Sequence, residues 1–268
     1  MKRFAGLFPS PRPIIGVIHL PPLPGFDGHP GMPALVAHAL ADLDVLMQEG
    51  VDGVLVENEY DRPHQVRASK EVIAAMTEIT QRVVSASRNI VVGCEILLND
   101  PRASLQVAAA SGAQFIRSDY FVDRMSRPGY GEFDIDPEGL VRYRNETAAD
   151  VLILADIQVK YATLLEARPL AESARLASLY GADAVVVTGS ATGDPPRLED
   201  LLEAAVGIAV SGNTIPVLIG SGLTAGNARK LLGACDGAIV GTALMRESKA
   251  NADAARSLMT EVGKLRQS

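Results

Sequence analysis

Short runs of Val, Ile and Leu recur along the chain, and segments with helical spacing of apolar residues separate them. Four runs share a further pattern, in which a small residue or glycine is followed by Asp or Gln, then apolar residues, then a polar end. They are Glu49–Asn58, Ser111–Asp119, Tyr180–Gly189 and Gly233–Thr242. These copies begin roughly 60 residues apart, the length of about two strand–helix units, so the chain has an internal repeat.

Further apolar runs lie before and between those copies, at Ile14–Leu20, Ile90–Leu97, Val151–Ile157 and Ile215–Gly222. Together the two sets predict eight strands, and their nearly continuous apolar character is typical of strands buried on both faces of a parallel sheet. Stretches 34–50, 72–84, 100–112 and 170–181 carry apolar residues three and four positions apart, which predicts helices.

This alternation predicts an α/β fold, a single (β/α)8 barrel domain spanning residues 1–268, with Ile14–His19 as its first strand. The alternative is an open doubly wound sheet. It is disfavoured because the turn after the first strand has no GxGxxG motif.

Composition and charge exclude several function classes. A net charge of -7, no Trp and 4% aromatic residues give neither attraction to nucleic acid nor a stacking platform for it. Cys94 and Cys235 lack metal-ligand spacing, so we expect buried thiols in a reducing compartment. No apolar run approaches the ~18 residues of a membrane span, and no signal-like segment precedes Pro9. We therefore expect a cytoplasmic protein with no membrane span and no nucleic-acid partner.

Polar or ionisable residues stand at the carboxyl end of nearly every predicted strand. In chain order they are His19, Glu57, Asn58, Glu95, Arg117, Asp119, Asp156, Thr188, Ser221 and Thr242, with Gln158 and Lys160 just beyond the fifth strand. The carboxyl ends of barrel strands meet at one mouth, where the active sites of such barrels lie. Any one of these residues also fits a solvated edge, a helix cap or a structural ion pair, but the set favours a polar site.

Chemistry gives each of these residues a candidate role. Glu57, Asp119 and Asp156 are candidate general acids or bases, and His19 is a further catalytic candidate. Lys160 suits an electrophile or, if desolvated, a Schiff-base nucleophile. The expected ligand-binding residues at the strand ends are Asn58, Glu95, Arg117, Gln158 and Thr188. A divalent cation held by Glu57, Glu95, Asp119 or Asp156 is the one candidate cofactor, because carboxylates suit hard cations.

Glycine-rich turns follow three of the predicted strands. The turns Gly220-Ser221-Gly222 and Gly241-Thr242 follow the seventh and eighth, where many barrels bind phosphate with backbone N–H groups. A third turn, with Gly189 and Ser190, follows the sixth strand and is expected to join them. The alternative is that these are only tight strand–helix turns. The first interpretation predicts a small phosphorylated ligand.

The fifth predicted strand raises a question of charge. Strand geometry turns Leu154, Asp156 and Gln158 to one face, toward the barrel interior. Asp156 would then stand near the other carboxylates at the mouth, and these cannot all ionise cheaply without a cation. Lys160 and a bound metal are the two candidates for that cation.

The segments with these residues resemble the BtpA/SgcQ family. The resemblance rests on GVIHLPPLPG at 16–25, DGVLVEN at 52–58, LILAD with VK at 159–160, VVTGSATGDP at 186–195, PVLIGSGLT at 216–224 and DGAIVGT at 236–242. It implies a TIM barrel similar to phosphate-binding barrels. One branch of the family is named for photosystem I biogenesis and associates peripherally with membranes. The other sits among sugar-transport and sugar-phosphate genes and is assumed to be enzymatic.

The family comparison yields two hypotheses. The first is an enzyme acting on a small phosphorylated metabolite such as a sugar phosphate, of isomerase, aldolase or hydrolase type. The second is a non-catalytic assembly factor for a membrane complex. We also expect a homo-oligomer. The chain departs from the family pattern at Gln158, where members usually carry His, and at Glu95 and Asp119, where Asn is common.

Overall fold

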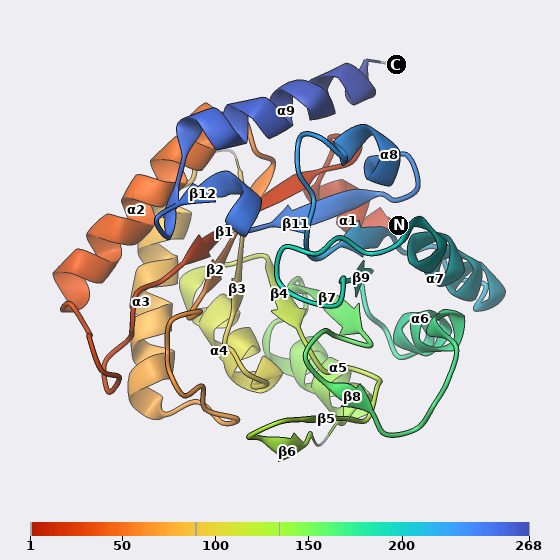
Figure 1. Ribbon diagram of the computed structural model, residues 1–268. Coiled ribbons are helices and arrows are strands. Elements are labelled where there is room, and N and C mark those ends of the chain that lie inside the picture. Colours follow the sequence, from red (N-terminus) through yellow and green to blue (C-terminus); the bar gives the residue numbers. More distant parts are fainter. Residues whose placement is uncertain (1, 89, 134, 268) are drawn as a thin grey trace.

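The computed structural model describes residues 2–88, 90–133 and 135–267 (Figure 1). Eight parallel strands close into a barrel in the order β1-β11-β10-β9-β7-β4-β3-β2. The strands are β1 (Ile14–His19), β2 (Gly53–Glu57), β3 (Val91–Glu95), β4 (Phe115–Ser118), β7 (Leu152–Ile157), β9 (Ala184–Val187), β10 (Val217–Ile219) and β11 (Gly237–Val240). The predicted barrel and the bounds of its first strand are confirmed.

Helices surround the barrel (Figure 1). They are α2 (Met32–Gln48), α3 (Lys70–Ala86), α4 (Pro101–Ser111), α5 (Pro137–Thr147), α6 (Leu170–Leu179), α7 (Leu198–Val210), α8 (Ala228–Leu232) and α9 (Ala252–Arg266). Local sequence sets their ends: Asp100 caps α4 by accepting from the Ala103 N–H, Pro101 occupies its first turn, and Gly112 ends it in the left-handed conformation.

Strand alternation divides the core into two parts. Outward residues such as Ile14 and Ile18 pack under the helices, whereas inward residues such as Ile15 and Val17 fill the barrel. The amino-terminal end of the barrel is plugged by helix α1 (Lys2–Leu7), which the sequence pattern did not predict. Phe4 and the adjacent Phe8 join the interior cluster, where the Phe8 ring lies 5.9 Å from the ring of Phe115.

The inward-facing side chains become polar toward the carboxyl ends of the strands. The next inward-facing position of each strand, two residues further along the chain, lies at the end of the strand or just after it. These positions are His19, Glu57, Glu95, Arg117, Asp156, Thr188, Gly220 and Gly241. This uppermost layer, which we call the mouth layer, contains one residue from each strand or the position just after it. The barrel interior is thus apolar where it is plugged and polar where it opens.

Two small sheets and a 3-10 turn lie at that open end. Strands β5 (Met125–Arg127), β6 (Gly131–Glu132) and β8 (Thr163–Leu164) form an antiparallel sheet. Strands β12 (Met245–Arg246) and β13 (Lys249–Ala250) form a hairpin after the 3-10 turn η1 (Thr242–Leu244). The first sheet connects the segment after β4 with the segment after β7.

Candidate functional site

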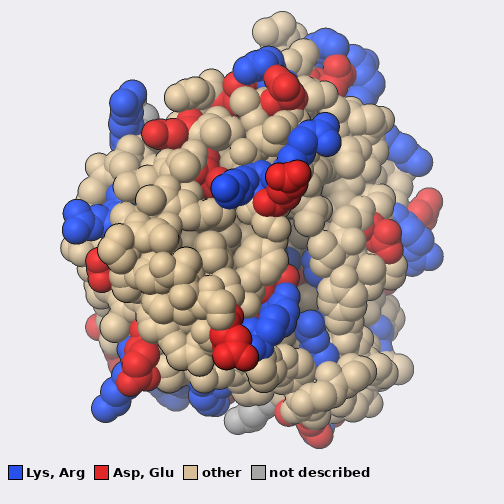
Figure 2. Space-filling model, turned by 60° about the vertical axis from the view of Figure 1, so that its left-hand side comes forward, with Lys and Arg blue, Asp and Glu red and all other residues tan. Residues whose placement is uncertain are grey.

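A cavity of about 610 Å³ opens at the carboxyl ends of the strands. Lys, Arg, Asp and Glu side chains lie in and beside a hollow on this side of the molecule (Figure 2). The predicted site residues that line the cavity are His19, Glu57, Glu95, Arg117, Asp119, Lys160, Gly220, Ser221, Gly222, Gly241 and Thr242. The structure therefore brings together most of the residues that the strand-end pattern selected.

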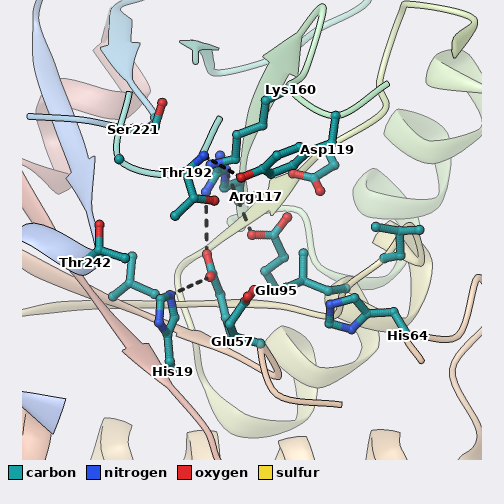
Figure 3. A pocket seen from close by; sticks show the side chains of 18 of the residues that line it. His19, Glu57, His64, Glu95, Arg117, Asp119, Lys160, Thr192, Ser221 and Thr242 are labelled. Carbon is teal, nitrogen blue, oxygen red and sulfur yellow. Dashed lines mark hydrogen bonds and ion pairs between the residues drawn. The ribbon is translucent and has the colours of Figure 1, made fainter. Parts of the chain in front are cut away.

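Arg117 is the central cation of the mouth layer. Its guanidinium donates two hydrogen bonds to Asp156, from Nε to Oδ1 at 3.0 Å and from Nη2 to Oδ2 at 2.8 Å. Its Nη1 also lies 3.6 Å from Glu57 Oε1, and its Nε lies 3.9 Å from Glu95 Oε2 (Figure 3). Three carboxyl groups from three other strands thus share one buried arginine.

This arrangement answers the charge question raised by the fifth strand. The cation that contacts Asp156 is Arg117, because Arg117 projects inward from β4 next to β7, and the charge of Lys160 acts on Asp156 more weakly. Asp156 faces the interior as predicted, but both of its oxygens are held by Arg117 beneath the cavity wall. Its geometry is that of a residue that positions Arg117.

The pKa values of Glu57 and Glu95 shift in opposite directions although both side chains are buried. Burial alone would raise the pKa of Glu57, but the hydrogen bond and charge of His19, with the charge of Arg117, lower this pKa to about 2. The His19 Nε2 lies 3.5 Å from Glu57 Oε2. Burial and the nearby Asp119 raise the pKa of Glu95 well above its ordinary value. The charged form is therefore favoured at Glu57 and the protonated form at Glu95.

Asp119 is the carboxyl group best placed to exchange a proton with a ligand. Burial, together with the charge of Asp156, raises its pKa to about 7, against the opposing charges of Arg117 and Lys160. The Asp119 carboxyl group makes no hydrogen bond or ion pair within residues 2–88, 90–133 and 135–267, and it lines the cavity beside Lys160 (Figure 3). A pKa near the operating pH is what general acid–base catalysis requires.

Close packing explains why glycines occupy the turn after β10. A Cβ on Gly220 would lie 2.5 Å from Val186 Cγ1 and 3.2 Å from Arg117 Nη2, so this position keeps space for the guanidinium. Gly222 has a φ of +69°, and a Cβ there would lie 2.1 Å from the backbone nitrogen of Pro195. Gly220 and Gly222 therefore let neighbouring protein groups approach the backbone of this turn, as expected for a tight strand–helix turn.

Ser221 takes part in the same packing. Its Oγ accepts from the Gly189 N–H at 2.9 Å and donates to the Asp194 carbonyl at 2.9 Å. In this structure the hydroxyl proton of Ser221 is therefore donated within the protein. The N–H groups of Gly222 and Gly241, by contrast, donate to no other group in the described chain. Thr242 lines the cavity beside them, so donors for an anion are still present after β10 and β11.

Five predicted ligand-binding residues lie outside the cavity wall. Asn58 joins two loops, with Nδ2 donating to Asp61 and Oδ1 accepting from the Leu97 N–H. Gln158 turns outward, because its φ of 45° breaks the strand alternation and its amide donates to Ser173 and the Arg168 carbonyl. The other three hold the turn after β9: Thr188 accepts from the Lys160 N–H, Gly189 donates to Ser221, and Ser190 donates to Asp194.

Several cavity residues come from loops and were not selected from the sequence. They are Arg62 and His64 after β2, Arg127 in β5, and Tyr161, Thr192 and Gly193 after β7 and β9. All follow a predicted strand end within the same connection. The segment 120–137, between β4 and α5, supplies Arg127 and Pro128. The proline-rich segment 20–33 contributes no residue to the cavity.

The described residues contain no group of three or more His, Cys, Asp or Glu side chains placed to hold a metal ion. Arg117 occupies the space among the carboxyl groups that such an ion would need. In the same part of the chain, no helix combines the length and apolarity needed to cross a bilayer.

Comparison with known proteins identifies relatives along nearly the whole chain. A family model described as BtpA family matches residues 10–262. The chain is 37% identical to "Photosystem I biogenesis protein BtpA" of Synechocystis over 250 residues, covering 91% of this chain and 84% of the relative. It is 34% identical over 249 residues to an uncharacterized protein of Archaeoglobus fulgidus, covering 92% and 97%.

Solved structures share the fold at low sequence identity. Thiamine phosphate pyrophosphorylase from Pyrococcus furiosus superposes with a TM-score of 0.58 at 19% identity, covering 94% of this chain and 96% of the other. N-(5'-phosphoribosyl)anthranilate isomerase from the same organism gives 0.58 at 14% identity, covering 94% and 99%. The two likenesses support the barrel assignment alone.

Proposed function

The chain belongs to the BtpA family, and we propose that it is an enzyme that moves a proton on a small phosphorylated metabolite, such as a sugar phosphate. The observation that carries the proposal is Asp119, a carboxyl group without a protein partner in the described chain, whose pKa is raised to about 7 by burial and by Asp156. Proton transfer at a carbon or hydroxyl is common to isomerases, aldolases and many hydrolases.

Charge in the cavity supports an anionic substrate. Four cations line it, Arg62, Arg117, Arg127 and Lys160, in a chain whose net charge is -7. Of the carboxyl groups around them, Glu95 has a pKa raised well above its ordinary value and Asp119 has a pKa raised to about 7, which favours their neutral forms. Glu57 is ionised beside His19 and Arg117, and Glu59 is paired with Arg62. Clustering positive charge in a cavity with low-dielectric walls attracts anions even when the protein as a whole is acidic.

The phosphate group is assigned to the turns after β10 and β11. The free N–H groups of Gly222 and Gly241 in the described chain, with the Thr242 hydroxyl, supply donors on one side of the cavity. The remainder of the ligand would then extend across Glu57 and Glu95 toward Asp119 and Lys160 (Figure 3). The two neighbouring barrels are named for phosphorylated compounds, but the proposal rests on the cavity of this chain.

Within this site the residues have distinct tasks. Asp119 exchanges the proton, and Lys160 supplies positive charge beside it. The ionised Glu57, paired with His19, supplies negative charge on the other side of the ligand, because a pKa of about 2 makes it a weak base. Asp156 holds Arg117 in place and does not touch the ligand. A divalent cation that arrives with the phosphorylated ligand is compatible with this scheme, so binding should be measured with and without Mg²⁺.

A panel of phosphorylated and unphosphorylated sugars tests the proposal by thermal shift. We expect phosphorylated members alone to raise the melting temperature. For the ligand that is turned over, Asp119→Asn should lower kcat about 10²–10⁴-fold while leaving its Kd within a few-fold. The limb of the pH–rate profile near pH 7 should vanish in this variant. Turnover that persists in Asp119→Asn would overturn the assignment.

The alternative function is a non-catalytic assembly factor, since the Synechocystis relative is named as a biogenesis protein. Indifference of this chain to every phosphorylated probe would favour it. An exposed apolar stripe on α7, formed by Leu202, Val206 and Val210 at 50%, 58% and 70% exposure, supports the expected homo-oligomer. Light scattering on Val206→Lys tests that expectation, because a charge in the stripe should shift the protein to monomer.

A further inference from the structure

The cavity has a second basic end, on the side away from the phosphate turns. His64 lies there, and Arg62 and Arg127, whose charges act on the His64 ring, line the same cavity. The three residues come from the connections after β2 and β4. In Figure 3, Ser221 and Thr242 lie to one side of Glu57 and Glu95, and His64 lies to the other. We call the three residues the distal basic cluster.

Arg127 supplies the uncompensated charge of this cluster. Arg62 is paired with Glu59, its Nη2 lying 2.7 Å from Oε1. Arg127, in contrast, has no carboxylate within ion-pair distance among residues 2–88, 90–133 and 135–267. Its guanidinium stacks against two aromatic rings, 5.8 Å from the centroid of Tyr130 and 5.4 Å from that of Tyr161. Within the described part of the chain, the half-buried guanidinium is thus held in place by aromatic rings and by no carboxylate.

His64 adds a donor that lacks an acceptor. Arg62 Nη1 contacts the His64 Nε2, and because a guanidinium only donates, Nε2 must be the acceptor of the pair. Burial, with the charges of Arg62 and Arg127, lowers the pKa of His64 to about 4, so the ring is neutral at physiological pH. A neutral ring that accepts at Nε2 carries its proton on Nδ1, and this buried Nδ1 has no partner in the part of the chain that the structure describes.

We propose that the distal basic cluster binds a second anionic group of the substrate, a carboxylate or a second phosphate. The substrate would then carry one anionic group at each end of a polyhydroxylated chain, as a phosphorylated sugar acid or a sugar bisphosphate does. The inference rests on the proposed function, since it assumes a phosphorylated ligand at the turns after β10 and β11. An unpaired guanidinium prefers a charged oxygen to a hydroxyl because charge-assisted hydrogen bonds are stronger.

Matched pairs of ligands test this inference by calorimetry. D-Glucitol 6-phosphate and 6-phospho-D-gluconate differ only in a terminal CH₂OH or carboxylate. Erythritol 4-phosphate and 4-phospho-D-erythronate form the same pair at a shorter length. We expect the acid to bind at least 10-fold more tightly than the alcohol at one length or both. Glucitol 1,6-bisphosphate, compared with glucitol 6-phosphate, tests a second phosphate in the same position.

Variants assign the preference to Arg127. Arg127→Gln should reduce the acid-over-alcohol preference to less than 3-fold, because it weakens binding of the acid more than binding of the alcohol. Arg127→Lys, which keeps the charge, should retain part of the preference. Arg142→Gln is the matched control, since Arg142 is a residue of α5 outside the cavity and its loss removes the same net charge. Equal melting temperatures of the variants and the parent protein would confirm folding.

The outcomes separate the proposed function from the proposed second anionic group. If both members of each pair bind equally well, the phosphorylated substrate stands and the second anionic group is wrong. A preference that survives in Arg127→Gln overturns the distal basic cluster as its source. If no phosphorylated probe binds, the proposed function fails and this inference falls with it.

Discussion

The plugged and open ends of the barrel interior are built on the same strands and the same alternation, yet they differ in every chemical respect. At the amino-terminal end, Phe4, Phe8 and Phe115 fill the interior. At the carboxyl end, most residues of the mouth layer are ionisable, and Arg117 follows Phe115 in the same inward row of β4. Packing alone stabilises one end, and charge balance governs the other.

This difference shows that burying the carboxyl groups of the mouth layer costs free energy, and that Arg117 offsets this cost. Apolar side chains at the plugged end gain free energy by leaving water, roughly 25 cal/mol per Å² of buried apolar surface. The carboxyl groups of Glu57, Glu95 and Asp156 lose solvation when buried and recover it through Arg117. Substitutions at the two ends should therefore respond differently to pH.

The largest effect is expected from Arg117→Met. This change leaves Asp156 and Glu57 buried without their cation, which should lower the free energy of unfolding by about 3–5 kcal/mol at pH 7.5. The loss should shrink at pH 5, because protonation removes the uncompensated charge. Urea denaturation at both pH values measures it, and Arg142→Met, outside the cavity, should change stability by less than about 0.5 kcal/mol. A loss that is independent of pH would contradict the charge-balance account.

The next effect is expected from Gly220→Ala. The added Cβ would crowd Val186 and the Arg117 guanidinium, so we expect a loss of about 1–3 kcal/mol in the free energy of unfolding. Gly263→Ala is the matched control: Gly263 lies within α9, a Cβ there would meet nothing within 4 Å, and Ala should stabilise the helix by up to about 1 kcal/mol. Equal effects at the two glycines would show that Gly220 does not make room for Arg117.

The sequence could predict the barrel and the strand-end residues because both depend on alternation along single strands. Asp156 and Glu57 face inward for the same reason that Leu154 and Leu55 do. The sequence could not predict that Arg117 pairs with Asp156, since the partners lie on different strands and the barrel register decides which side chains meet.

Loops account for the rest of what sequence reasoning missed. Gln158 departs from the strand face because its backbone takes a positive φ, which alternation does not anticipate. Arg127 and Tyr161 meet over the cavity because β5 pairs with β8, a contact between two separate connections. The turns after β9 and β10 resemble phosphate turns in sequence, but Ser221 joins them to each other through Gly189 and Asp194.

A smaller and pH-independent effect is expected at the plugged end. Phe115→Leu removes part of a fully buried ring from the contact with Phe8, so we expect a loss of about 1–2 kcal/mol in the free energy of unfolding. Among the described residues, no ionisable group takes part in this apolar cluster, so the loss should be equal at pH 5 and pH 7.5. The two pH values used for Arg117→Met serve here as well. A loss that varied with pH by more than about 0.5 kcal/mol would mean that the two ends are coupled.

The smallest effect is expected from Asp119→Asn, and its sign is opposite. The pKa of Asp119 rises to about 7 in the folded protein from an ordinary value of 3.8, so folding favours its protonated form. That stabilisation is fully present below pH 3.8 and is lost as the pH rises through about 7. Asn cannot ionise, so the variant should match the parent protein in stability near pH 4 and be more stable than it at pH 8.

Partial solvent access limits the gain in stability to about 1 kcal/mol, or about 2–4 °C in melting temperature. Melting curves from pH 4 to pH 8 measure this difference, with the exposed Asp27→Asn as a control that should stay flat. A variant that is less stable than the parent protein at pH 8 would mean that Asp119 is an ionised structural partner of Lys160, and its role as the proton-exchanging group would have to be abandoned.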